Sequence, residues 1–465
     1  MAKFDSKIVK GEDQCNILVG GTLIDGRGGD ALVDSAIVIQ GQRIAEVRIS
    51  DGLDYGDAAN VIDVRGKYVL PGLIDIHVHY ADWMGQLFLS HGVTTVKDLG
   101  NDIEWIASVS NEIEQGKISG PRILYVGNGL DAPPPDRNTH VGLAGEDSAK
   151  RAVELLHSKG ACAIKVREKI GPELLAVVAE ESHKRGLPIT GHLKRTDARQ
   201  AAIAGIDGIE HLSGFAQALT NAARERPADL DEWQLLISDL KAFSLIDLSA
   251  AEELISFLVS RNVAIAPTLP IWWRMAFSYR DRFASEDAKL AEDPALAYIP
   301  EQIRALWANA AFFEINNSAE LQEVQLGYAK TLDIVLAHYK SGGEVLAGSD
   351  TFFSIPGLNM HRELMLLRDA GISPLEVISI ATLRNARFLR KENDLGTITV
   401  GKLADILVVD ENPLDDIGNT QKVSLVMKGG QVVDSGEDAN YFVPKPKPQQ
   451  SAWMLKNMAR NERRV

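Results

Sequence analysis

The chain has 465 residues, of which 45% are hydrophobic and 24% are charged, and its formal net charge is −15. The length suits roughly two to four domains, or one large barrel with an attachment. This ordinary composition excludes collagen-like, disordered and disulfide-rich classes of protein. The acidic excess argues against a nucleic-acid partner, because binding to phosphates requires basic surfaces.

The cysteines and the N-terminal segment bear on the compartment. Cys15 and Cys162 are the only cysteines, and neither lies in a C-x-x-C motif, so no disulfide framework or cysteine metal site is predicted. The first residues contain no apolar run of signal-peptide length, and no run approaches the roughly 18 apolar residues of a spanning helix. We therefore expect a cytoplasmic protein without a membrane partner.

Short β-branched runs dominate residues 1–67. Runs at 17–19, 36–39, 43–47 and 60–64 are separated by glycines, which predicts a small all-β unit. A phosphate-binding loop at 20–29 is the alternative, but the glycine spacing fits no nucleotide motif and no helix follows. Similar runs return between 396 and 433. We predict that residues 1–67 and 390–440 form one composite β-sandwich.

Between residues 68 and 389, eight strand-like runs alternate with segments of helical periodicity. This alternation predicts a parallel sheet with crossover helices, and eight strands can close a (β/α)8 TIM barrel. An open doubly wound sheet is the alternative, but polar residues recur where the runs end, which favours the barrel. The runs are residues 69–78, 94–99, 122–126, 163–166, 188–191, 208–211, 264–268 and 345–347.

Three further segments have no place in this alternation. Residues 216–248 and 271–325 exceed normal strand–helix connections, and long connections on this face of a barrel usually shape a substrate pocket. Helical decoration, or a contact within the homo-oligomer that we expect, fits them equally well. In the tail, residues 441–465, prolines alternate with lysines, which favours polyproline II. The tail either packs on a neighbouring subunit or is solvated.

Histidines stand at the ends of several predicted strands. His77 and His79 end the first, and because strand residues i and i+2 face the same side, both imidazoles point to the barrel mouth. His192, His211 and Asp350 end the fifth, sixth and eighth strands, where barrel enzymes keep catalytic groups. A lone buried histidine is more often a core residue, but this set suits Zn, Co, Mn or Fe. We predict one or two divalent metals that activate water, with a carboxylate taking its proton.

Lys165 ends the fourth predicted strand, close to the predicted metal ligands. An ammonium group there would be repelled by divalent cations. The side chain is therefore turned away, neutral, or converted by CO2 into an anionic carbamate that could bridge two metals. An ion pair with Glu168 is the ordinary alternative.

Four other side chains are candidates for the substrate pocket. His140, in the loop 127–145, could hydrogen-bond a substrate carbonyl, or it is merely an exposed loop residue. Trp83 follows the His-x-His strand closely, and Trp272 and Trp273 follow the seventh strand. Core packing is the alternative for the tryptophans, but at least one of the last two is expected to face a hydrophobic small-molecule substrate.

Taken together, these motifs resemble the amidohydrolase superfamily. The likeness is carried by the strand-end residues above and by segments 19–26, 70–75, 92–99, 395–398 and 401–406. It covers nearly the whole chain. Within the superfamily the chain looks most like the imidazolonepropionase-related branch, with its prolidases, ochratoxinase-like amidases, molinate hydrolase and phenylurea hydrolases.

The resemblance implies a role for each strand-end residue. His77 and His79 would bind the more buried metal, and His192 and His211 the other. A carbamate on Lys165 would bridge both ions. Asp350 would ligate the first metal and pass a proton to the leaving group.

The resemblance also implies the chemistry. We expect cleavage of an amide-like C–N or C–S bond in a small hydrophobic (thio)carbamate or urea, such as a molinate-like or phenylurea herbicide. The alternative is a prolidase- or ochratoxinase-like amidase acting on N-acyl amino acids or dipeptides, although no arginine pattern typical of a dipeptidase pocket is evident. A non-catalytic scaffold on this fold would lack a metal ligand, and none is missing.

Overall fold

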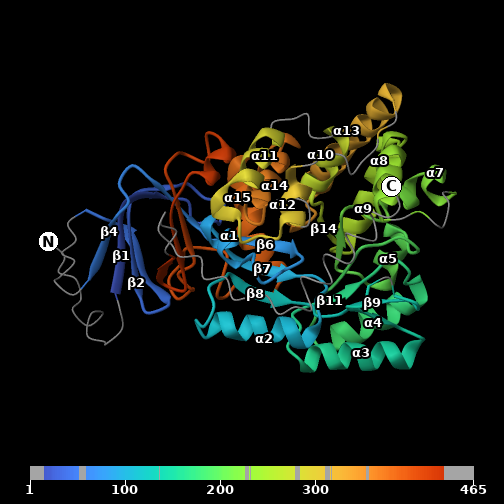
Figure 1. The fold of residues 1–465 in the computed structure, drawn as a ribbon, viewed down its shortest axis with the longest axis horizontal. Helices are drawn as coiled ribbons and strands as arrows, with labels where there is room; N and C mark the ends of the chain where they lie inside the picture. The colour runs from blue at the N-terminus through green and yellow to red at the C-terminus, as the bar shows by residue number, and fades with distance from the viewer. Residues whose placement is uncertain are drawn as a thin grey trace.

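The structure is a computed structural model, and it describes most of the chain (Figure 1). The tail 441–465 and the ends of the predicted sandwich lie outside the described residues, so the expectations for them stay predictions. The described residues are 15–51, 59–135, 137–225, 230, 232–277, 283–308, 315, 317–351 and 355–433.

Both ends of the chain build one sheet, with strand order β17-β16-β15-β5-β1-β2-β3 and with β4 beside β1. The two ends pair as expected, but in a single hydrogen-bonded sheet, because β5 pairs with β1 on one edge and with β15 on the other. Figure 1 shows strands of this sheet at one end of the molecule and helices α7 and α8 at the opposite end. The strands are β1 (Cys15–Leu23), β2 (Leu32–Gln40), β3 (Arg43–Ile49), β4 (Asn60–Asp63), β5 (Tyr68–Pro71), β15 (Ile406–Val409), β16 (Val423–Lys428) and β17 (Gln431–Val433).

The remaining strands form two parallel sheets, ordered β6-β7-β8 and β10-β9-β11-β12-β13-β14. Seven of the eight predicted runs appear here as strands. Two short strands, β9 and β10, lie where a loop was expected. The strands are β6 (Leu73–Val78), β7 (Val93–Asp98), β8 (Arg122–Tyr125), β9 (Gly129–Asp131), β10 (His140–Gly142), β11 (Ile164–Val166), β12 (Ile189–Gly191), β13 (Gly208–Glu210) and β14 (Ala264–Ala266).

The first predicted run divides at Gly72 into β5 and β6, which belong to different sheets. The N–H of Gly72 donates to Asp405 at 2.8 Å, whereas the N–H of Leu73 donates to Gly92 at 2.9 Å. A Cβ at Gly72 would lie 2.2 Å from Oγ1 of Thr94, so only glycine allows this close approach. The terminal sheet is therefore covalently continuous with the strand that carries His77.

Hydrogen bonds also connect the two parallel sheets to each other. The N–H of Cys162 donates to Tyr125 of β8 at 2.8 Å. The last predicted run is reduced to one parallel bridge, Val345 with Ile265, and its Ala347 accepts from the N–H of Ile76 at 3.1 Å. Asn385 completes this last junction: its amide donates to Ile74 at 2.6 Å and to Ala347 at 2.8 Å, and accepts from the Ala347 N–H at 3.1 Å.

Helices connect successive parallel strands, as their periodicity predicted. In α4, for example, the buried residues Leu175, Val178 and Ala179 lie on one face. Asp197 and Gln200 cap the start of α5, and Gly205, in the left-handed conformation, ends it. These helices are α1 (Gly85–Ser90), α2 (Ile103–Glu114), α3 (Glu146–Ser158), α4 (Pro172–Lys184), α5 (Ala198–Ala204) and α9 (Leu248–Ser260). After the last run come α14 (Leu358–Asp369), α15 (Pro374–Ser379), a π-helical turn at Ile380–Arg384 and α16 (Asn385–Phe388).

The two long connections are largely helical. None of the helices in the described residues is both long and apolar enough to span a bilayer. Helix α13 packs against α8 and α9, so the two connections lie together. They contain α6 (Phe215–Leu219), α7 (Asn221–Arg224), α8 (Glu232–Ser244), α10 (Leu269–Phe277), α11 (Ala284–Glu292), α12 (Glu301–Ala308) and α13 (Ser318–Lys340), with a short 3-10 turn at Pro294–Leu296. A second 3-10 turn, Ile417–Gln421, lies between β15 and β16.

Candidate metal centre

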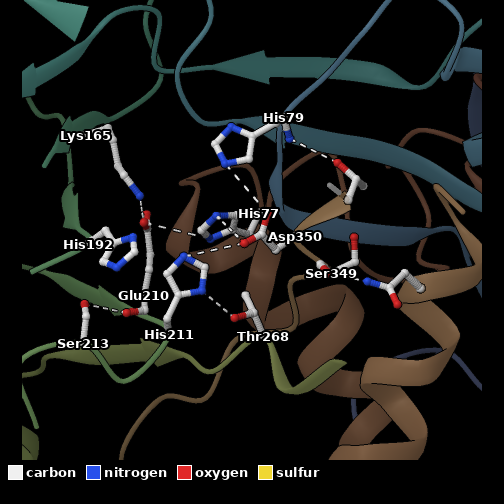
Figure 2. Close-up of polar contacts among 12 residues, drawn as sticks. His77, His79, Lys165, His192, Glu210, His211, Ser213, Thr268, Ser349 and Asp350 are labelled. Carbon is white, nitrogen blue, oxygen red and sulfur yellow. Dashed lines mark hydrogen bonds and ion pairs between the residues drawn. The ribbon is translucent and has the colours of Figure 1, made fainter. Parts of the chain in front are cut away.

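The predicted ligands converge at the carboxyl ends of the parallel strands (Figure 2). They come from five places along the sequence, because parallel strands bring their carboxyl ends to one face. They are His77 in β6, His79 after it, Lys165 in β11, His192 after β12, His211 after β13 and Asp350 after the bridge at Val345.

Asp350 faces three of the four imidazoles. Its Oδ2 lies 3.9 Å from Nε2 of His77 and 3.8 Å from Nε2 of His211, and its Oδ1 lies 3.8 Å from Nε2 of His79. One ligand atom each from His77, His211 and Asp350 lies within 4.8 Å of the others. The His192 and His211 ring centroids are 4.7 Å apart, so the fourth histidine adjoins the same cluster.

Burial keeps these histidines neutral. It lowers the pKa of His77, His79, His192 and His211 well below the usual value, and neighbouring positive charges lower it further. A neutral imidazole offers the lone pair that a metal needs. Both ring nitrogens of His77 are buried without a hydrogen-bond partner, which is costly unless another group satisfies them. This donor set fits a divalent cation.

Lys165 is fully buried, and its Nζ contacts Glu210, not the Glu168 of the alternative ion pair. Glu168 instead accepts from Nη2 of Arg167 at 3.0 Å. Burial also lowers the pKa of Lys165 well below that of an ordinary lysine, which favours the neutral amine among the three states considered. The side chain points into the cluster beside His192 (Figure 2), so it is not turned away.

Two buried carboxyl groups of the site were missed by sequence reasoning. Glu210 lies 3.9 Å from Nδ1 of His77, and its position directly before His211 was the available signal. Asp75 accepts from the N–H of His77 at 3.1 Å and from the N–H and hydroxyl of Ser349. Asp75 therefore ties the strand of His77 to the segment that carries Asp350.

His140 does not lie in an exposed loop. It begins β10, where it pairs with Gly129, and only 7% of it is exposed. The loop expectation was wrong because β10 adds to the edge of the parallel sheet. Burial, then the positive charges of Arg167 and Arg137, lower the pKa of His140 to about 2, so this imidazole is neutral.

The three tryptophans have different surroundings. Trp83 packs against Trp307 of α12, with ring centroids 6.0 Å apart. Trp272 is buried and donates its indole N–H to Pro267 at 3.0 Å, as a core residue would. Trp273 is half-buried, and its ring centroid lies 4.2 Å from that of Phe277. A pocket role for any of them stays a prediction.

Comparison with known protein families shows the family to which the chain belongs. The model of the Amidohydrolase family matches residues 68–433, from β5 to the end of the described residues. The chain therefore belongs to the amidohydrolase family, whose members are hydrolases that typically bind divalent metals.

Individual relatives are distant. The chain is 23% identical to ochratoxinase from Aspergillus niger over 505 residues, which cover 92% of this chain and 90% of that protein. It is 29% identical to adenine deaminase from Chelativorans sp. (strain BNC1) over 180 residues, which are 35% of this chain. The match spans only 29% of the length of that adenine deaminase.

Solved structures agree on the fold. A Xaa-Pro dipeptidase has a TM-score of 0.65 at 21% identity, over 90% of this chain and all of that chain. Molinate hydrolase has a TM-score of 0.62 at 18% identity, over 91% of this chain and 95% of that one. At these identities the likeness shows the α/β fold of the family alone.

Proposed function

We propose that this chain is a metal-dependent hydrolase whose parallel strands form a (β/α)8 barrel. The observation that carries the proposal is the meeting of four neutral histidines and Asp350 where parallel strands end. Within this set, both ring nitrogens of His77 lack a hydrogen-bond partner. The hydrogen bonds from Cys162 to Tyr125 of β8 and from Ile76 to Ala347 support the closed barrel.

The proposed ligands divide between two divalent ions, drawn from Zn, Co, Mn or Fe. His77, His79 and Asp350 would hold one ion, and His192 and His211 the other. The neutral amine of Lys165 would add CO2 to form a carbamate that reaches both. Bound metals would polarise the scissile carbonyl and lower the pKa of water.

The protein groups would move the protons. Asp350 would accept the proton of the attacking water on a carboxylate oxygen and donate it to the leaving nitrogen or sulfur. His140, neutral and buried, would donate a hydrogen bond to the substrate carbonyl. In the described structure its Nδ1 is buried without a partner, which supports this role.

We propose a small, hydrophobic (thio)carbamate or urea as the substrate, cleaved at an amide-like C–N or C–S bond. Trp83, four residues after His79, packs on Trp307, so apolar side chains lie close in sequence to a proposed ligand, which fits an apolar substrate. Likeness to molinate hydrolase agrees with this choice, although it reaches only the fold.

The second candidate is an amidase acting on N-acyl amino acids or dipeptides. It is favoured by Arg137 and Arg167, whose positive charges act on His79, His192 and Lys165. Such a cationic surrounding complements a substrate carboxylate. The sequence showed no arginine pattern of this kind, because these two residues belong to segments that only the fold brings to the site.

Metal analysis and a substrate panel test the proposal. The purified chain should contain up to two divalent ions and should lose activity on chelation. The panel should comprise carbamates, thiocarbamates, ureas, N-acyl amino acids and dipeptides, which separates the two candidates. A chain that binds no metal and cleaves none of them would be a scaffold, and the proposal would be wrong.

A further inference from the structure

Glu363 is a buried carboxyl group that lies outside the proposed ligand set. It belongs to α14, and none of its side chain is exposed. Its Oε2 accepts from the N–H of Leu269 at 2.7 Å. This side chain thus binds the backbone segment that follows β14.

This segment needs such support. Thr268 has a φ of +48°, in the left-handed region that β-branched residues rarely adopt. Leu269 is the first residue of α10, so its N–H has no partner within that helix. The Glu363 carboxyl group supplies that partner and holds the turn in place.

Thr268 in turn contacts His211. Its Oγ1 lies 2.7 Å from the carbonyl oxygen of Pro267 and 2.6 Å from Nδ1 of His211. A hydroxyl has one proton, and when it donates that proton to Pro267 its oxygen accepts from Nδ1–H. Nε2 of His211 then carries the lone pair, and this is the atom that lies 3.8 Å from Asp350.

We propose that Glu363 is a positioning residue for the metal centre, acting through the turn at Thr268 on His211. The chain of contacts runs from the carboxyl group to the Leu269 N–H, to the left-handed turn, to the Thr268 hydroxyl, and to the imidazole. Partners of this kind fix the orientation of a metal ligand and the nitrogen that it offers. The inference rests on the proposed function, because it takes His211 and Asp350 as ligands.

Cobalt binding to the metal-free, full-length chain tests the inference. Affinity is measured by competition with a chelator, and the visible spectrum of Co²⁺ reports its coordination. Glu363→Leu and Thr268→Val should each weaken cobalt binding about 10–100-fold and change the spectrum. Thr268→Ser, which keeps the hydroxyl, should bind as the wild type does. The double variant should lose no more cobalt affinity than the single variant that binds cobalt more weakly.

Leu367→Ala is the matched control. Leu367 is a fully buried residue of the same helix with an apolar side chain, so its truncation lowers stability without removing a hydrogen bond to the turn. Thermal unfolding of the metal-free variants shows the folding cost of each. If Glu363→Leu does not fold, the test uses Thr268→Val and Glu363→Gln. The glutamine keeps one acceptor oxygen, so Glu363→Gln should lose less cobalt affinity.

Two results would overturn the inference. One is wild-type cobalt affinity in folded Glu363→Leu or Thr268→Val. The other is a pattern of losses that does not follow the chain of contacts, whether additive losses in the double variant or a loss in Leu367→Ala as large as in Glu363→Leu at equal stability. A wild-type chain that binds no cobalt would instead contradict the proposed function.

Discussion

At the scale of single residues, burial determines the chemistry available at the cluster. The imidazoles are neutral because desolvation penalises their charged form, and the same effect drives Lys165 toward the free amine. A free amine can react with CO2, whereas an ammonium group cannot. Lys165 is thus the residue on which the proposed two-metal site depends most.

Replacing Lys165 with alanine should therefore remove metal and activity together. We expect at least one equivalent of metal to be lost, with partial rescue by short carboxylic acids that occupy the place of the carbamate. Metal content and turnover with and without added acid are the measurements.

Lys150→Ala is the control for this prediction. The Lys150 side chain is 45% exposed and pairs with the surface residue Glu146, so its loss should change neither quantity. Full metal content and activity in Lys165→Ala would refute the bridging role.

At the scale of elements, the strand ends must be held in register for the ligands to meet. The junction between β6 and the last run has two backbone hydrogen bonds, from Ile76 to Ala347 and from Asp350 to His77, and Asn385 reinforces it. Its side chain makes three hydrogen bonds, to Ile74 and to both backbone groups of Ala347. His77 lies three residues after Ile74, and Asp350 three residues after Ala347.

Asn385→Ala should lower the free energy of unfolding by about 3 kcal/mol, because it leaves buried backbone groups unsatisfied. Metal affinity should fall as well, since the two ligand segments lose their shared clamp. Chemical denaturation and chelator competition measure the two effects.

Asn111→Ala provides the comparison for this experiment. Asn111 is exposed on α2, and its side chain accepts a hydrogen bond from Gln115 one helical turn later. Its replacement should cost less than about 0.5 kcal/mol. Equal stability of the two variants would show that Asn385 is not a clamp.

At the scale of the whole molecule, the terminal sheet and the ligand strands form one connected structure. Val408 of β15 pairs with Val69 of β5, and β5 continues through Gly72 into the strand of His77. Strands β5 and β15, which are far apart in the sequence, are thereby connected to the strand that carries a proposed metal ligand.

Val408→Asp should disrupt this connection. Val408 is fully buried, so a carboxylate there would cost more than about 3 kcal/mol. We expect a lower unfolding temperature and weaker cobalt binding.

Val432→Asp introduces the same charge in the same sheet, where the side chain is 46% exposed, and should change neither property. Wild-type cobalt affinity in folded Val408→Asp would show that the sheet and the metal centre are independent.

Several features of the site were predictable because they depend on local pattern. The spacing of His77 and His79 places both on one strand face whatever surrounds them. The polar residues after other runs were found in the same way. Glu210, Thr268 and Glu363 were not, because nothing in their local sequence distinguishes a second carboxyl or hydroxyl group that contacts a ligand.

The sequence by itself determined the alternation of strands and helices and the identity of the residues at the strand ends. These follow from periodicity and from side-chain chemistry, which need no knowledge of distant partners. The tertiary structure alone decided which groups meet: Glu363 with Leu269 across 94 positions, and Asn385 with Ile74 across 311. Such contacts depend on how strands pair and helices pack, so they arise only when the chain is folded.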